Sequence, residues 1–159
     1  MTGCRNRVMR VILALYVVQP DAWRRMTCDA GCSQQMDVVF VLDISGSVQE
    51  MVDNAMMFAG NVTYGLDIDS GNVRVAAVAY SSSPLGQFYL RDYVNRREAV
   101  INALRFFNPG GSTHTSSALD EVRNTHLTAA YGARSGVKKV NGVTTGTTIL
   151  SVITARRYA

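Results

Sequence analysis

The stretch "DVVFVLDISGSV", residues 37–48, decides the fold. Its apolar, mostly β-branched run, Val38–Leu42, does not alternate with polar residues, so it predicts a strand that is buried on both faces of a sheet. The run ends at Asp43, and Ser45 and Ser47 follow at alternate positions. The strand therefore presents one carboxylate and two hydroxyls at its carboxyl end.

Strands and helices are predicted to alternate along the rest of the chain. Apolar residues at helical spacing predict helices over 49–66, 95–107 and 116–127. Further strands are predicted over 72–80 and, as an edge strand after a turn at 81–86, over 87–93. The last strand candidates are "GVKKV", 136–140, and "ILSVIT", 149–154. This order indicates an α/β fold with a mostly parallel sheet.

The carboxyl end of a strand is where ligands bind in such sheets. A hard divalent cation takes oxygen ligands, and Asp43, Ser45 and Ser47 can converge on one if alternate residues of the loop point the same way. In the alternative interpretation, Asp43 and Ser47 only cap the following helix. The triplet alone does not decide between the two.

A second loop, "GGSTHTSSAL" at 110–119, brings Thr113 and Thr115 just ahead of a helix. With "VVFVLDISGSV" it resembles the von Willebrand factor A domain, and the resemblance runs from Asp37 to about Val140. "VRVAAVAYSS" and "GQFYLRDY" are similar to that family's second and third strands. The extracellular-matrix members, such as those in matrilins and in fibril-associated or type VI collagens, are the most similar.

The resemblance implies a three-layer, Rossmann-like fold with a mostly parallel central sheet, one antiparallel edge strand and the Asp43 strand at the centre. It also implies a metal-ion-dependent adhesion site, whose matching positions here are Asp43, Ser45, Ser47 and Thr113. The ion would be Mg²⁺, or Mn²⁺ or Ca²⁺. Because hydroxyls leave its charge under-compensated, a carboxylate from a partner can complete the shell. The implied protein is a secreted binding module for an extracellular-matrix or cell-surface protein with an acidic residue, and not an enzyme.

The end of the chain departs from the family pattern. The fourth strand of the family runs into a sequence such as "VITDG", whose aspartate completes the metal site. If 149–154 is that strand, Ala155 stands at the aspartate position, and if 136–140 is, Asn141 and Gly142 follow. No Asp or Glu occurs after Glu121, so we expect a weakly binding site.

The resemblance also ends early, at about the fourth strand, so we expect a partial domain that lacks the C-terminal part. Residues 141–159 form an atypical tail, and we hypothesise that a variant transcript or an incorrect gene model produced it. The alternative function is that of a domain remnant with an impaired metal site, which acts in metal-independent structural interaction or has no function.

The N-terminus predicts export. Basic residues in the first ten positions precede "VILALYVV", 11–18, which is far shorter than the roughly 20 apolar residues of a membrane span. We therefore expect a signal peptide at 1–22, a cysteine-containing linker at 23–36 and a partial domain at 37–159. A frayed apolar N-terminus is the alternative. In an oxidising compartment, Cys28 and Cys32 can pair with each other, or one of them can pair with a cysteine beyond the end of this sequence.

Other classes of function have little support. The net charge of +4 comes from the two ends, since residues 37–136 carry ten acidic residues against seven arginines, and no basic face with aromatics indicates nucleic-acid binding. His114, His126 and Asp120 invite a catalytic interpretation, but no G-x-S-x-G motif is present, and we expect His114 to be a rim or structural residue. "NVT", 61–63, matches a glycosylation sequon, a pattern that also arises by chance.

Overall fold

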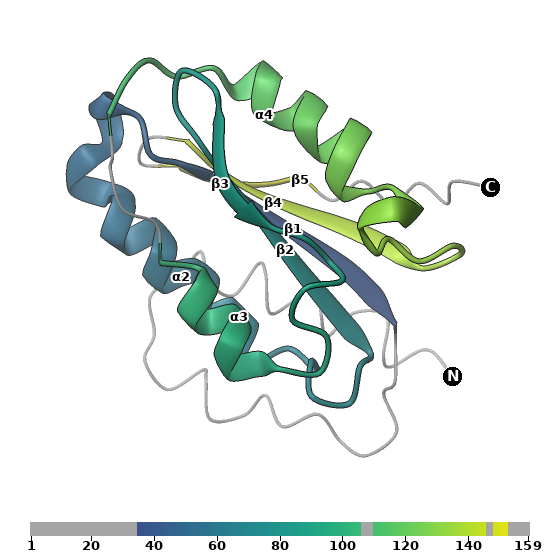
Figure 1. Ribbon diagram of the computed structural model, residues 1–159. Coiled ribbons are helices and arrows are strands. Elements are labelled where there is room, and N and C mark those ends of the chain that lie inside the picture. Colours follow the sequence, from purple (N-terminus) through teal and green to yellow (C-terminus); the bar gives the residue numbers. More distant parts are fainter. Residues whose placement is uncertain (1–34, 106–109, 146–147, 153–159) are drawn as a thin grey trace. The chain divides into compact units, whose positions relative to one another are not determined.

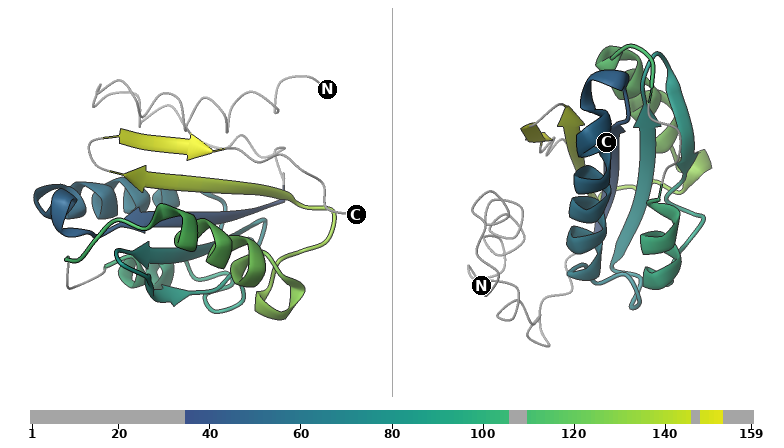
Figure 2. Two further views of the ribbon diagram at one scale, coloured as in Figure 1. Left: turned by 90° about the horizontal axis from the view of Figure 1, so that it is seen from above. Right: turned by 90° about the vertical axis from the view of Figure 1, so that its left-hand side faces the viewer.

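The computed structural model describes residues 35–105, 110–145 and 148–152, of which 86, 87, 145 and 148–152 are described by backbone alone. The strands are β1 (Met36–Asp43), β2 (Val73–Tyr80), β3 (Pro84–Phe88), β4 (Lys138–Thr145) and β5 (Thr148–Val152). They form one sheet in the order β3-β2-β1-β4-β5, which the view from above in Figure 2 shows around β1. β1 is thus the central strand, as the sequence predicts.

The sheet is parallel at its centre and antiparallel at both edges. β1 pairs in parallel with β2 and with β4. β3 runs antiparallel to β2, as predicted for the edge strand, and β5 runs antiparallel to β4. The predicted α/β class is confirmed, and β5 adds a second antiparallel edge that was not predicted.

Helices lie on both faces of the sheet. A 3₁₀ segment, Gly46–Met51, leads into α2 (Val52–Tyr64), and α3 (Arg97–Ala103) lies beside α2. α4 (Thr115–Glu121) continues into a π-helical turn, Val122–His126, and a 3₁₀ turn follows at Ala129–Tyr131. Figure 1 shows α2 and α4 on opposite sides of the sheet, which gives the three layers that the sequence predicts.

The core explains why β1 lacks alternation. All eight residues of β1 are buried. Val39 and Val41 pack with Ala118 and Val122 on the α4 side. Because α2 covers the other side, the intervening residues of the strand are buried as well, and each such apolar side chain contributes roughly 1.5–3 kcal/mol.

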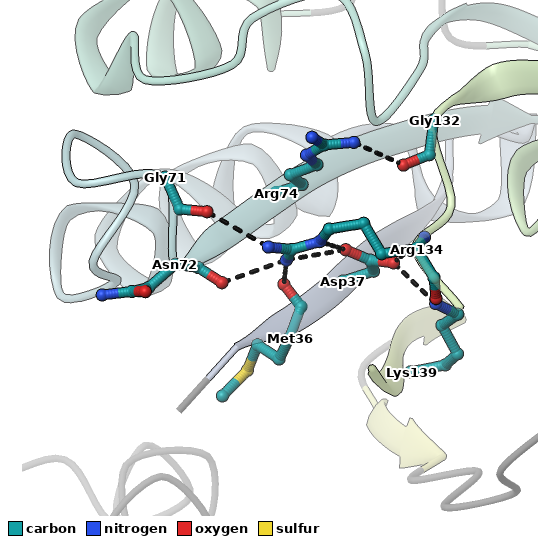
Figure 3. A network of polar contacts seen from close by, with 8 residues as sticks. All are labelled: Met36, Asp37, Gly71, Asn72, Arg74, Gly132, Arg134 and Lys139. Atoms are coloured by element: carbon teal, nitrogen blue, oxygen red, sulfur yellow. Dashed lines mark hydrogen bonds and ion pairs between the residues drawn. The ribbon is translucent and has the colours of Figure 1, made fainter. Parts of the chain in front are cut away.

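A buried charge cluster lies at the amino end of β1 (Figure 3). Asp37 is fully buried and accepts hydrogen bonds from Arg134 and Lys139. The Arg134 guanidinium also donates to the carbonyls of Met36, Gly71 and Asn72. This end of the sheet is thus held by ionic contacts, while Asp43 occupies the opposite end.

Several predicted boundaries were wrong. The edge strand is Pro84–Phe88 rather than 87–93, because the chain reverses within three serines and Pro84 already pairs with Tyr80. The strand then stops where the Asp92 carboxylate accepts a hydrogen bond from the backbone N–H of Tyr89 at 2.8 Å. The first two predicted helices exist but are shorter than the patterns over 49–66 and 95–107 suggested, and residues 106–109 lie outside the described ranges. The third is confirmed, because α4 and its π-helical turn together cover 115–126, close to the predicted 116–127.

Candidate metal-binding site

Two loops meet at the carboxyl end of β1. One is the turn after Asp43, and the other is the glycine-rich segment that precedes α4. The backbone N–H of Gly110 donates to the carbonyl of Ile44 at 2.7 Å, and the N–H of Gly46 donates to the carbonyl of Gly111 at 3.0 Å. These two bonds fix the loops against each other, so side chains about 70 residues apart in the sequence come within contact.

The predicted hydroxyls converge between these loops. Thr113 Oγ1 donates to Ser45 Oγ at 2.8 Å, Ser45 Oγ lies 3.1 Å from Ser47 Oγ, and Ser47 Oγ lies 3.4 Å from Thr113 Oγ1. Ser45 is fully buried, whereas Ser47 and Thr113 are exposed. The triangle of oxygens is therefore closed on the protein side and open towards solvent.

Asp43 adjoins this triangle through the backbone. Its side chain is buried, and Oδ1 accepts a hydrogen bond from the Ser45 N–H at 2.9 Å. Oδ2 is also buried but has no hydrogen-bond partner among the described residues. A buried carboxylate oxygen without a partner is costly, and it is the clearest sign that a ligand belongs here.

This donor set fits a hard divalent cation. Mg²⁺ is usually bound by one or two carboxylates and completes its shell with water or ligand oxygens. In the described ranges no three His, Cys, Asp or Glu side chains cluster as metal ligands. The side-chain oxygens that the described loops bring together at this end of the sheet are one carboxylate and three hydroxyls.

The turn after β2 supports the second loop. Ser81 O accepts a hydrogen bond from the His114 N–H, and Ser82 Oγ accepts one from the Ser112 N–H, both at 2.9 Å. His114 Nδ1 lies 2.9 Å from the carbonyl oxygen of Ser82. These contacts agree with the interpretation of His114 as a structural residue and hold Thr113 from both sides.

The third loop begins at a residue that the sequence did not single out. The parallel strand beside β1 is β4, Lys138–Thr145. "ILSVIT" is therefore not the family's fourth strand, since β5 turns back on β4, and Ala155 lies outside the described residues. The segment "GVTTG", 142–146, matches "VITDG" in position, so Thr145 stands where the family has its aspartate.

The site includes two residues that sequence reasoning missed. Thr144 is buried, and its Oγ1 accepts a hydrogen bond from the Asp43 N–H at 3.0 Å. The hydroxyl of Tyr80 donates to the Thr144 carbonyl at 3.1 Å and lies 3.2 Å from Thr115 Oγ1. The T-T-G in "GVTTG" was the available signal for Thr144, because it follows the T-D-G of the family pattern.

The residues of the catalytic alternative are not assembled. Asp120 is exposed and pairs with Arg123 at 3.3 Å. His126 is fully buried, and neither ring nitrogen has a hydrogen-bond partner in the described part of the chain. Burial, the largest cause, lowers the pKa of His126 below its ordinary value of 6.5, against the opposing influence of Glu121.

The sequence model of the von Willebrand factor type A domain matches residues 37–148. The chain belongs to this family. The match extends beyond Val140, where the resemblance in the sequence appeared to end, and includes the whole of β4.

Among curated proteins, the chain is 34% identical over 115 residues to integrin alpha-1 of Gallus gallus, which is 72% of this chain and 40% of that protein. It is 31% identical over 121 residues to matrilin-1 of Gallus gallus, which is 74% of this chain and 24% of that protein. It is also 36% identical over 103 residues to the collagen alpha-5(VI) chain of Homo sapiens, covering 62% and 4%. The chain thus spans less than half the length of these relatives.

Among solved structures, the fold is similar to proximal thread matrix protein 1 from the mussel byssus. The TM-score is 0.62 at 21% identity, over 70% of this chain and 30% of that one. In another structure of that protein, zinc occupies the MIDAS motif, that is, the metal-ion-dependent adhesion site. At this identity the likeness concerns the fold alone. In the described residues, no helix is long and apolar enough to cross a membrane.

Proposed function

We propose that this chain is an extracellular protein-binding module with a divalent-metal-dependent adhesion site at Asp43, Ser45, Ser47 and Thr113. The observation that carries the proposal is Oδ2 of Asp43, which is buried and has no partner among the described residues, in a site where the hydroxyls of Ser47 and Thr113 are exposed and that of Ser45 is buried. The integrin, matrilin and collagen relatives support an adhesive role.

Each residue has a separate task in this site. Asp43 supplies the negative charge, and the Ser45 N–H holds its carboxylate in place. The hydroxyls of Ser45, Ser47 and Thr113 supply neutral oxygens. A bound Mg²⁺ or Mn²⁺ would supply an under-compensated positive charge, to which a carboxylate on a matrix or cell-surface partner can bind.

The third loop sets the strength of the site. Thr145 replaces the family's aspartate, so Asp43 is the only anionic ligand that the three loops can offer. Loss of a supporting group commonly lowers metal affinity 10–100-fold. We therefore expect weak binding, in the millimolar range of extracellular divalent cations.

Metal-independent interaction is the second candidate. It is favoured by the third loop, because no Asp or Glu follows Glu121 in the sequence to complete the metal site. In that case the domain would bind through its surface or have lost its adhesive function.

Calorimetric titration of the purified chain with MgCl₂ and MnCl₂ distinguishes the two. We expect weak, saturable binding in the wild type and none in Asp43→Asn. Glu98→Gln is the matched control, because Glu98 is exposed on α3, far from the candidate site. Its neighbour Arg97 donates its backbone N–H to Asp69, in the turn before β2 at the opposite end of the sheet. Equal binding by Asp43→Asn and the wild type would reject the site, and no binding in the wild type would favour the second candidate.

Export is part of the proposal, with a signal peptide at 1–22, a linker at 23–36 and the domain at 37–159. A C-terminally tagged chain expressed in a secretory host should appear in the medium, shortened by roughly 20–30 residues. Replacing Arg5, Arg7 and Arg10 with glutamate should reduce export. A full-length product kept in the cytosol would contradict this part of the proposal without bearing on the metal site.

A further inference from the structure

Asn61 begins the single N-x-S/T tripeptide of the chain, "NVT", and the structure shows where it lies. It is in the second half of α2 (Val52–Tyr64), and its side chain is exposed. A sugar on Asn61 therefore points away from the core and displaces no buried residue. A buried asparagine could not carry a sugar in the folded protein, so the exposure of Asn61 meets the first condition for glycosylation.

Thr63, the third residue of the tripeptide, has no structural use for its hydroxyl. Its side chain is fully buried, and Oγ1 has no hydrogen-bond partner among the described residues. Valine has nearly the same shape without the cost of an unpaired buried hydroxyl. The fold alone therefore favours valine here, and the hydroxyl calls for a reason outside the folded structure.

The surface around Asn61 supplies a third observation. Met57 and Tyr64 lie four residues before and three residues after it, so all three share one face of the helix. Met57 is 62% exposed and Tyr64 is 69% exposed, and both are among the few exposed large apolar residues in the described chain. A bulky, hydrophilic glycan between them would cover this apolar face.

We propose that Asn61 is N-glycosylated, and that the sugar is attached before α2 folds. In the transfer, Nδ2 of Asn61 forms a bond to the anomeric carbon of an oligosaccharide carried on a polyprenyl diphosphate. The bond from that carbon to the diphosphate breaks, the diphosphate leaves with the electron pair, and the amide loses one proton. The Thr63 hydroxyl must be accessible to the transferase, and only the unfolded helix exposes it.

The glycan leaves the candidate metal site open. Asn61 lies nine residues after Val52, about 14 Å along the helix axis at 1.5 Å per residue. α2 starts at the end of the sheet where Asp43 lies and runs away from it. A sugar at Asn61 thus directs any partner towards the loops that carry Asp43 and Thr113.

The test is expression of the full chain behind a secretion signal of established strength in mammalian cells. The proposal rests on the export proposed above, and this signal supplies entry into the secretory pathway, so a failure of the native signal cannot imitate a failure of glycosylation. We expect a gel shift that peptide N-glycosidase removes, with conversion of Asn61 to aspartate detected by mass spectrometry. Asn61→Gln and Thr63→Val should lose the shift, whereas Thr63→Ser should keep part or all of it.

Two results would overturn the proposal. The first is secreted wild-type chain without sugar at Asn61. The second is efficient glycosylation of the folded, bacterially produced chain by purified transferase, which would reject attachment before folding. Thr63→Val made in bacteria should unfold at the same or a higher urea concentration than the wild type, and a lower midpoint would show that the hydroxyl has a structural role.

Discussion

Asp37 and Arg134 lie 97 positions apart in the sequence and form a two-pronged ion pair at the amino end of β1. Oδ1 of Asp37 is 2.8 Å from both Nε and Nη2 of Arg134, and Oδ2 accepts the Arg134 backbone N–H at 2.8 Å. Lys139 Nζ lies 2.6 Å from Oδ2 (Figure 3). One buried carboxylate thus fixes the segment before β4 to the central strand.

Replacing Asp37 with asparagine should destabilise the domain strongly. The change keeps the side-chain shape but leaves two cations, whose side chains are 15% and 7% exposed, without a counter-charge. Removing one partner of a buried ion pair typically costs about 3–5 kcal/mol. Urea unfolding should show a much lower midpoint with an unchanged slope.

The matched control for Asp37→Asn is Asp120→Asn. Asp120 and Arg123 form an exposed pair whose side chains are 64% and 70% exposed. Such pairs contribute about 0–1 kcal/mol, so this variant should unfold close to the wild type. If both variants lose a similar free energy of unfolding, burial is not the reason why the Asp37 cluster stabilises the domain.

Gly111→Ala should disturb the second loop of the candidate site. Gly111 has φ +83°, and a Cβ would lie 2.6 Å from Ser82 Oγ, the atom that accepts the Ser112 N–H. A backbone conformation of this kind costs about 1–3 kcal/mol for other residues, and the displaced serine no longer holds the loop that carries Thr113. Chemical unfolding should show that loss, and calorimetry should show weaker Mg²⁺ binding.

Gly60→Ala should have the opposite effect on stability. Gly60 lies within α2, and a Cβ there would meet no atom within 4 Å. Alanine in a helix interior is more stable than glycine by about 0.5–1 kcal/mol. Losses of stability in both variants would mean that any added methyl group is harmful, and that the conformation of Gly111 is not the cause.

His126 should make stability depend on pH. Burial lowers its pKa in the folded state below 6.5, so the unfolded chain binds the proton more readily. Its contribution is therefore fully present above about pH 6.5 and is lost progressively as the pH falls. The free energy of unfolding should be lower at pH 5.5 than at pH 7.5 in the wild type. This difference should be smaller in His126→Leu.

His114→Gln is the control for replacing a histidine, because His114 is exposed and lies outside the core. If the wild type and His126→Leu lose the same stability over that range, another group is responsible.

The sequence predicted the parts of the fold that depend on local patterns. The unbroken apolar run of β1 predicted its burial on both faces, and its central position was predicted from the order of strands and helices together with the resemblance to the family. The resemblance to the von Willebrand factor A domain implied that Ser45, Ser47 and Thr113 share one site, and their hydroxyl oxygens lie within 3.4 Å of one another.

The parts that it did not predict depend on contacts between distant segments. β4 was recognised only as far as Val140, because Asn141 and Gly142 have low strand propensity. Gly142 pairs with Phe40, and a Cβ there would lie 3.4 Å from the Phe40 ring. β4 thus continues to Thr145, because the space beside Phe40 fits a residue without a side chain. The position that corresponds to the family's aspartate is therefore Thr145 and not Ala155.

The end of β4 lies close to Asp43. Met36 pairs with Lys138, and the last pair of the two strands is Val41 with Val143. Beyond that pair, the Asp43 N–H donates to Thr144 Oγ1 at 3.0 Å, so β1 and β4 are still in contact at Thr144. Thr145 is the next residue, and we therefore choose position 145 for adding a second carboxylate to the site.

Thr145→Asp should strengthen divalent binding by roughly ten-fold or more, in line with the cost of losing a supporting group. Without metal it should also lower the midpoint of urea unfolding, because two neighbouring carboxylates repel each other, and saturating Mg²⁺ should restore the midpoint. Ala155→Asp adds the same charge beyond the described strands and should change neither quantity. Calorimetry and unfolding of the two variants with and without Mg²⁺ provide the comparison. Equal effects of the two aspartates would show that the added negative charge alone, and not its position, changes metal binding. Tighter binding only in Ala155→Asp would reject Thr145 as the third-loop position.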